Sequence, residues 1–195
     1  MFWLILLVVV CFLGIDLFLG IRFFEYVYSA HIRHQPPLVQ ANKILRCAVI
    51  NYINANYKNV KNICEIGSGF GTLARAMAKK TGATVWALEN MPFAAFVSKF
   101  MDLFCRGHNK TIWCDAFDWM DNTNMVFDIA VAYLGPELTA KIPQYKNKIH
   151  VLISIDFEIK NMKPRNVIDM GRGATIYMGK KYPHRIFIYE LNHRD

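Results

Sequence analysis

The sequence lacks several patterns that assign a chain to a class of protein at once. Its five cysteines form no C-x-x-C pair and no paired framework, which argues against disulfides and predicts reduced thiols in an intracellular domain. No spacing of histidines and cysteines is typical of a zinc site, and we expect no metal. There is also no internal repeat and no low-complexity tract, so the chain is expected to fold as an ordinary domain.

The glycine-rich stretch at residues 60–71 lacks the marks of a phosphate site. Glu65-Ile66-Gly67-Ser68-Gly69-Phe70-Gly71 follows a short apolar run and precedes a helical pattern. A phosphate cradle needs a lysine after the last glycine, and a dinucleotide site has the spacing G-x-G-x-x-G. Neither is present, and an acidic residue is unfavourable beside a phosphate. Glycines at a strand-to-helix turn still let the backbone turn tightly and let a ligand approach closely.

Two further strand patterns also end in a carboxylate. The β-branched and aromatic run at residues 84–89 ends in Glu89, about 20 residues after the glycines. A carboxylate at that spacing suits hydrogen bonds from ribose hydroxyls, and the next residue, Asn90, is included in the predicted site. A third run, at residues 111–115, ends in Asp115 and is followed by Ala116. Three acids in order, each at a strand end, are a much stronger signal of a binding site than the glycines alone.

The alternation of strand and helix patterns predicts an α/β fold. Helices are expected at 38–56, 72–80 and 92–104, and the aromatic stripe of the last, which runs from Phe93 to Phe104, is interpreted as core. The expected strands are residues 60–66, 84–89, 111–115, 127–132, 151–155, 175–178 and 185–190. A turn at residues 179–184 would join the last two as an antiparallel hairpin, completing a sheet of seven strands.

The apolar residues of the chain are concentrated at its N-terminus. Phe2 to Leu19 is interrupted only by Gly14 and Asp16, and a run of this length can span a bilayer. We therefore predict a transmembrane anchor at residues 1–28, a proline-bearing linker at 29–37 and a domain at 38–195. A cleaved signal peptide is the alternative, but no basic residue precedes the apolar run.

The positive residues Arg22 and Arg33 follow the apolar run, and only the amino terminus precedes it. The positive-inside tendency then places the domain in the cytoplasm, as a single-pass protein of the inner membrane if the source is bacterial. The formal net charge of +8 is compatible with binding to anionic lipid or nucleic acid, and equally with an ordinary solvated surface.

Residues 36–195 resemble the class I methyltransferases, whose motif I has the form of Glu65 to Gly71 and binds S-adenosylmethionine. The resemblance implies a Rossmann-like sheet of seven strands with that cofactor at its carboxyl edge. It also implies that Asp115, with the backbone at Ala116, bonds the adenine amino group. The predicted cofactor-binding residues are Glu65, Gly67, Ser68, Gly69, Gly71, Glu89, Asn90, Asp115 and Ala116.

The overall design is similar to the small membrane-anchored lysine methyltransferases, whose eukaryotic members modify the ATP synthase c subunit and the adenine nucleotide translocase. An N-terminal anchor, a minimal core and the loop Leu134-Gly135-Pro136 carry this resemblance. Those enzymes usually have Asp-x-Gly-x-Gly-Asp-Gly, where this chain has Glu65 and Phe70. The resemblance implies methyl transfer to a lysine of a protein, with membrane proteins among the candidate substrates.

The loop after the fourth strand lacks the Asn/Asp-Pro-Pro-Tyr/Phe of nucleic-acid amino methyltransferases, so a nucleic-acid partner is disfavoured. A lysine nucleophile must lose a proton first, because its ordinary pKa is about 10.4. The catalytic candidates, chosen by position, are Tyr133, Glu137, Asp156 and Glu158. Two alternatives stay open: a methyltransferase for a lipid-soluble small molecule such as a quinone precursor or phospholipid, and a non-catalytic, membrane-tethered cofactor-binding module.

Overall fold

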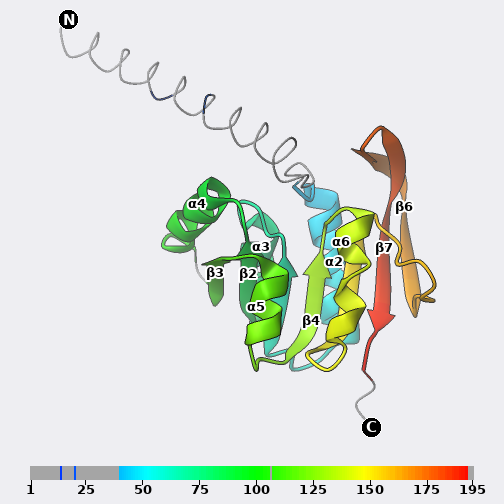
Figure 1. Cartoon of the computed structure of the whole chain (residues 1–195), viewed down its shortest axis with the longest axis horizontal. Helices are drawn as coiled ribbons and strands as arrows, with labels where there is room; N and C mark the ends of the chain where they lie inside the picture. The colour runs from blue at the N-terminus through cyan, green and yellow to red at the C-terminus, as the bar shows by residue number, and fades with distance from the viewer. Residues whose placement is uncertain (1–13, 15–19, 21–39, 106, 193–195) are drawn as a thin grey trace, which may run out of the picture. The chain divides into compact units, whose positions relative to one another are not determined.

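A computed structural model describes residues 40–105 and 107–192, together with Gly14 and Gly20 (Figure 1). The predicted anchor at 1–28 and the linker at 29–37 lie outside these residues, apart from the two glycines. Among the helices described, none has both the length and the apolar character needed to cross a bilayer.

Seven strands form one sheet in the order β3-β2-β1-β4-β5-β7-β6. β1 to β5 are parallel, whereas β7 runs antiparallel to both β5 and β6. The strands are β1 (Asn62–Ile66), β2 (Thr84–Glu89), β3 (Asn109–Trp113), β4 (Phe127–Ala132), β5 (Ile149–Ile155), β6 (Asn166–Tyr177) and β7 (Lys180–Glu190). The predicted seven-stranded α/β sheet with an antiparallel C-terminal hairpin is confirmed.

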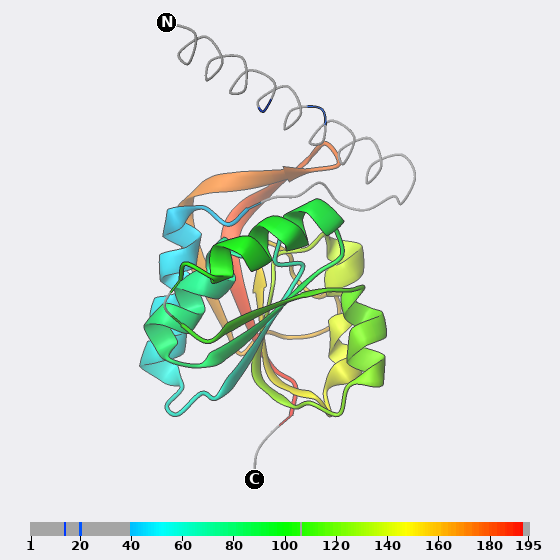
Figure 2. The same cartoon turned by 90° about the vertical axis from the view of Figure 1, so that its left-hand side faces the viewer.

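The helices cover both faces of the sheet and give it two cores (Figure 2). On one face, α2 and α3 contribute Leu45, Val49 and Met77 to an apolar cluster. On the other, Met120, Ile142 and Tyr145 pack against the strands. The helices are α2 (Lys43–Asn56), α3 (Thr72–Thr81), α4 (Pro92–Asp102), α5 (Ala116–Asn122) and α6 (Pro136–Thr139), followed by the 3-10 helix η2 (Ile142–Tyr145). Because both faces are covered, the inner strands are continuous apolar runs, and this pattern made them predictable.

The interpretation of the aromatic stripe on α4 as core is wrong. Ala94, Ala95 and Ser98 are the residues that this helix buries, and α4 packs over β2 and β3. Phe96 is 67 % exposed and Phe104 is 70 % exposed. Small side chains let the helix approach the sheet closely, so the large residues at neighbouring positions are left facing outward.

The predicted turn at residues 179–184 is also wrong in its extent. The chain reverses at Met178 and Gly179, and Lys180 already pairs with Tyr177 across the hairpin. Pro183 pairs with Ala174 of β6, in a stretch of β7 that has no partner strand on its other side. A proline lacks the N–H for a second ladder, and at such an edge none is needed.

Candidate active site

The glycine loop between β1 and α3 stands at the carboxyl edge of the sheet. Gly67, Gly69 and Gly71 have φ values of 73°, 56° and 68°. The amides of Gly67 and Ser68 donate to the carbonyl of Leu88 at 2.9 and 3.0 Å, which fixes the loop to the end of β2. A Cβ on Gly71 would collide with the hydroxyl of Ser98 on α4, so the loop has no room for a side chain there.

Two polar side-chain atoms, one just before this loop and one within it, are buried without a partner among the described residues. Glu65 is 6 % exposed and Ser68 is 7 % exposed. Within the described part of the chain, Oε2 of Glu65 and Oγ of Ser68 form no hydrogen bond. Burial raises the pKa of Glu65 from 4.5 to about 8; the Ala74 amide opposes this and the Glu89 carboxylate adds to it. Buried polar groups are normally paired, so these atoms indicate a ligand with hydrogen-bond donors or positive charge.

Glu89 braces the glycine loop from β2. Its Oε2 accepts from the amide of Gly69 at 2.6 Å, and its Oε1 accepts from the amide of Met91 at 2.8 Å. Each carboxylate oxygen can accept a further hydrogen bond, and the role toward ribose stays a prediction. Asn90 is half-buried, and its carbonyl accepts from the indole of Trp113 at 3.1 Å.

Asp115 lies after β3 and caps α5. Its Oδ1 accepts from the amides of Phe117 at 2.8 Å and Asp118 at 3.3 Å. Ala116 is the first residue of α5. Because β1, β2 and β3 are neighbouring parallel strands, these residues share one edge with the glycine loop and Glu89. The adenine role of Asp115 and Ala116 stays a prediction.

Arg75 joins the glycine loop to α4. Its place one helical turn after Gly71 was the only sign of this role in the sequence. Its Nη2 donates to the carbonyl of Phe70 at 2.5 Å. Its Nη1 forms a salt bridge with Asp102 at 3.1 Å, and both side chains are mostly buried. The rings of Phe70 and Phe93 also touch edge to face, with centroids 6.3 Å apart. The position of α4 is therefore coupled to that of the loop.

Of the four catalytic candidates, the structure brings Tyr133 and Asp156 together. The Tyr133 hydroxyl donates to Oδ2 of Asp156 at 3.0 Å, and Thr175 Oγ1 donates to the same oxygen at 2.7 Å. The hydroxyls of Tyr133 and Thr175 also contact each other. Nδ1 of His184 lies 2.8 Å from Oδ2 and is the donor, because a carboxylate only accepts. The Arg185 amide donates to Oδ1 at 3.1 Å.

This Asp156 cluster (Tyr133, Asp156, Thr175 and His184) brings β6 and β7 to the carboxyl ends of β4 and β5. The Asp156 side chain is fully buried and its backbone has φ 65°. Burial raises the pKa of Tyr133, so its hydroxyl stays protonated at neutral pH. Nothing local marked Thr175 or His184 in the sequence, because the hairpin register alone brings them here.

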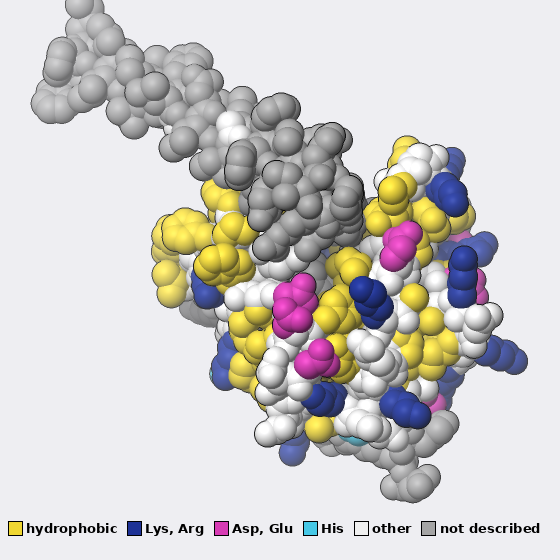
Figure 3. Space-filling view, viewed as in Figure 1, with side chains coloured by type: hydrophobic (Ala, Val, Ile, Leu, Met, Phe, Trp, Pro, Cys, Tyr) yellow, Lys and Arg dark blue, Asp and Glu magenta, His cyan; other side chains and the backbone are white. Residues whose placement is uncertain are grey.

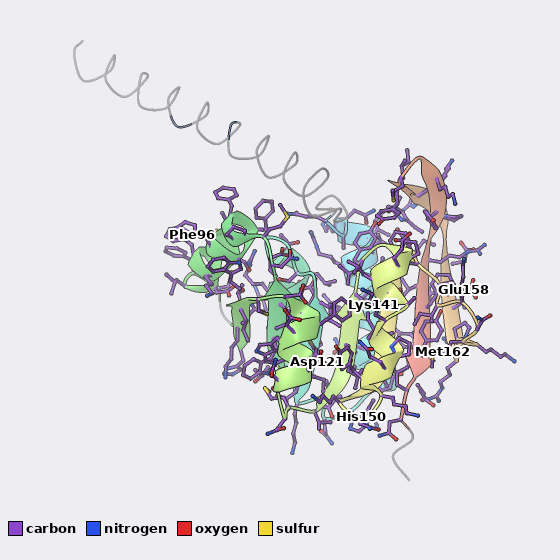
Figure 4. All side chains as sticks on the ribbon, viewed as in Figure 1. Phe96, Asp121, Lys141, His150, Glu158 and Met162 are labelled. Carbon is purple, nitrogen blue, oxygen red and sulfur yellow. The ribbon has the colours of Figure 1, made fainter. Side chains whose placement is uncertain are left out.

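The other two candidates lie apart from the Asp156 cluster. Glu137 is exposed at the start of α6 and accepts from the Tyr177 hydroxyl at 3.2 Å. Glu158 is exposed on the side of the sheet formed by β6 and β7 (Figure 4). Three aromatic rings connect Tyr133 with the surroundings of Glu137. Tyr133 packs on Phe157, which contacts Tyr177 and Tyr182 at centroid distances of 5.5 and 4.8 Å.

No protein-family model and no curated protein matches this sequence. Solved structures do match the fold. An RNA methyltransferase from Salinibacter ruber, in complex with S-adenosyl-L-homocysteine, has a TM-score of 0.64 at 14 % identity, covering 80 % of this chain and 96 % of its own.

Two further solved structures have a similar fold. TrmK of M. capricolum, in complex with S-adenosyl-homocysteine, has a TM-score of 0.58 at 14 % identity and covers 74 % of this chain and 68 % of its own. A precorrin 8w decarboxylase from Methanobacterium thermoautotrophicum has a TM-score of 0.57 at 13 % identity. It covers 78 % of this chain and 91 % of its own. At these identities the likeness establishes the fold alone, and the domain has the Rossmann-like fold of the class I methyltransferases.

Proposed function

We propose that this protein is a membrane-anchored, S-adenosylmethionine-dependent methyltransferase that acts on an amino group, with a lysine side chain of a protein as its substrate. The observation that supports the cofactor is a pair of buried atoms at a glycine loop that has no lysine: Glu65 Oε2 and Ser68 Oγ have no hydrogen-bond partner among the described residues. The structures of the same fold that contain the demethylated cofactor support it as well.

The residues present fit this cofactor. Glu65 and Ser68 would face its amino-acid part, whose ammonium group offers the donors that their atoms lack. Glu89 would accept from the ribose, and Asp115 with Ala116 would bound the adenine. When bound, the cofactor supplies an electrophilic methyl group on a sulfonium. The loop residues hold and orient it, and burial keeps the site poor in water.

The acceptor side of the site suits a primary amine. The half-buried rings of Tyr133 and Tyr182, which pack against Phe157, can contact the alkyl chain and cationic head of a lysine. Asp156 is already bonded by three side-chain donors, so we assign it the positioning of Tyr133. Exposed Glu137, beside Tyr177, is the better candidate to accept the proton that the ammonium must lose.

Membrane anchoring is supported by the sequence of residues 1–28 alone. The anchor would hold the active site near substrates in or beside the bilayer.

RNA is a second candidate acceptor. The Salinibacter ruber protein is described as an RNA methyltransferase, and the net charge of +8 would favour a polyanion. The chain lacks the Asn/Asp-Pro-Pro-Tyr/Phe motif after β4, where it has Tyr133-Leu134-Gly135-Pro136. We therefore place RNA second.

The test incubates the full-length protein with methyl-tritiated cofactor and membranes and RNA from cells that lack it. Glu65→Gln is the site variant, because it keeps the shape and removes the carboxylate. Asp121→Asn is the matched control, an exposed acid at the far end of α5. We expect a labelled protein that yields methyl-lysine on hydrolysis, lost in Glu65→Gln and kept in Asp121→Asn.

Label in RNA would favour the second candidate, and label confined to the organic extract would favour a small-molecule acceptor. Absence of label together with absence of cofactor binding by calorimetry would contradict the enzymatic function itself.

A further inference from the structure

The α4 patch consists of Phe96, Phe100, Met101, Leu103 and Phe104, and all five side chains are exposed. Their exposed fractions range from 41 % for Met101 to 78 % for Leu103. Phe100 and Phe104 stack edge to face, with centroids 5.2 Å apart, so the patch is continuous. Single exposed apolar residues are ordinary, but a contiguous group of large ones indicates a contact surface. Figure 3 shows this group as an apolar cluster over α4.

A second apolar projection stands at the same edge of the domain. The hairpin tip (residues 176–181) exposes Ile176 at 72 % and Met178 at 79 %. In Figures 1 and 2, which share a vertical axis, α4, the β6–β7 turn and the start of α2 all lie toward the carboxyl ends of the parallel strands. The glycine loop ends at this edge too. The two projections therefore stand on either side of the candidate active site.

The charges of these two elements favour an anionic partner. Their exposed charged residues, within the part of the chain that is described, are Lys99 on α4 and Lys180 and Lys181 at the tip. Asp102 of α4 is turned inward to Arg75. Phenylalanine, leucine and methionine flanked by lysine is the composition of helices that lie in the interface of anionic membranes.

The shape of the surface and the preceding sequence favour lipid over a folded partner. A convex helix and a separate hairpin tip make two protrusions, which a fluid bilayer can accommodate without a complementary surface. The predicted anchor ends at residue 28, and about 11 residues of extended chain reach at most about 40 Å to the described domain at residue 40. An anchored domain is thus held within reach of the bilayer.

We infer that the α4 patch and the hairpin tip dock the domain on an anionic bilayer, so that the active-site edge faces the lipid and receives a methyl acceptor at the membrane surface. This inference rests on the proposed membrane anchoring. Because Arg75 and Phe70 tie α4 to the glycine loop, docking would also hold α4 against the cofactor site.

The test uses the full-length protein in vesicles of phosphatidylcholine and phosphatidylglycerol whose acyl chains are brominated near the head group. The background has Cys11→Ala, Cys47→Ser and Cys105→Ser, since Cys47 and Cys105 are exposed. An environment-sensitive dye is placed at Phe96→Cys, in the patch, or at Asp121→Cys, at the other end of the molecule (Figure 4). Quenching of the dye by acrylamide, which is dissolved in the water phase, reports how far the dye is exposed to water.

We expect the dye at position 96 to be quenched by brominated lipid and protected from acrylamide, and the dye at position 121 to behave oppositely. Adding Phe100→Glu and Phe104→Glu should abolish lipid quenching at position 96. The matched control is Val126→Glu, an exposed apolar residue just before β4, which should leave the quenching unchanged.

Quenching at position 96 by acrylamide and not by lipid would overturn the inference. Protection from both would overturn it in favour of coverage by protein, either residues 1–39 or a second copy. Lipid quenching at both positions would overturn the proposed orientation. Each of these readouts is independent of methyl transfer, so a failed docking surface can be told apart from a failed enzymatic function.

Discussion

At the scale of residues, burial controls the protonation of Glu65. In the free protein its pKa is raised to about 8 by burial, so it is neutral at pH 7. A cationic ligand beside Oε2 favours the carboxylate, and binding should then release a proton below pH 8. Affinity for S-adenosylmethionine is expected to rise by up to about tenfold per pH unit toward pH 8 and to level off above it.

Calorimetry in buffers of different ionisation enthalpy measures that proton directly. Glu65→Gln should bind more weakly at pH 8 and release no proton, whereas Ser68→Ala should weaken binding but keep the release. A wild-type protein that binds with no proton release at pH 7 would show that Glu65 does not face the positive charge.

The two ends of α3 offer a matched pair of glycines. Gly71 and Gly82 have φ values of 68° and 74°, so alanine is strained by about 1 kcal/mol or more at both. At Gly71 the new Cβ would also meet Ser98 and lie 2.8 Å from Nη1 of Arg75, whereas nothing lies within 4 Å at Gly82. Gly71→Ala should therefore lose more stability than Gly82→Ala in urea unfolding. Equal losses of stability would mean that Ser98 and Arg75 move away from the new Cβ at little cost in free energy.

At the scale of elements, Asp156 holds the C-terminal hairpin to the parallel part of the sheet. Asp156→Ala leaves the donors of Tyr133, Thr175 and His184 without their buried acceptor. We expect the free energy of unfolding to fall by about 3 kcal/mol or more. Asp169→Asn, which breaks an exposed pair with Arg185 in the same hairpin, should change it little. Comparable effects of the two substitutions in urea unfolding would contradict a structural role for the cluster.

The inner strands were predictable because burial on both faces gives each one a continuous apolar run. The placement of Glu65, Glu89 and Asp115 at one edge was predictable for a related reason, since parallel strands bring their carboxyl ends together. The helical periodicity of α4 identified an apolar stripe, but it did not show which face of the helix packs on the sheet. The small residues Ala94, Ala95 and Ser98 form that face. Thr175 and His184 reach Asp156 through hairpin register and a bulge between Asp169 and Ala174, which no local pattern encodes.

At the scale of the whole molecule, the fold and the substrate are set by different parts of the chain. The sheet superposes on the Salinibacter ruber protein at only 14 % identity, so many sequences can build it. The α4 patch, the loop after β4 and the hairpin tip surround the site without forming the inner sheet. We therefore look for acceptor specificity in those elements rather than in the cofactor edge, which the fold shares among different chemistries.

The boundary of the domain yields the last prediction. In the described part of the chain, every buried apolar residue lies between Ala41 and Tyr189, and Val39–Asp195 forms one compact unit. A chain that begins at Val39 should therefore unfold at the same urea concentration as the domain in the full-length protein. S-adenosylhomocysteine at 100 times its Kd should stabilise both by about 2.7 kcal/mol, since a ligand of the native state acts by mass action. The shortened chain should bind vesicles far more weakly, and only through the α4 patch and hairpin tip. Failure of the shortened chain to fold, or stabilisation of the full-length protein alone, would mean that residues 1–38 form part of the domain and are not a separate anchor.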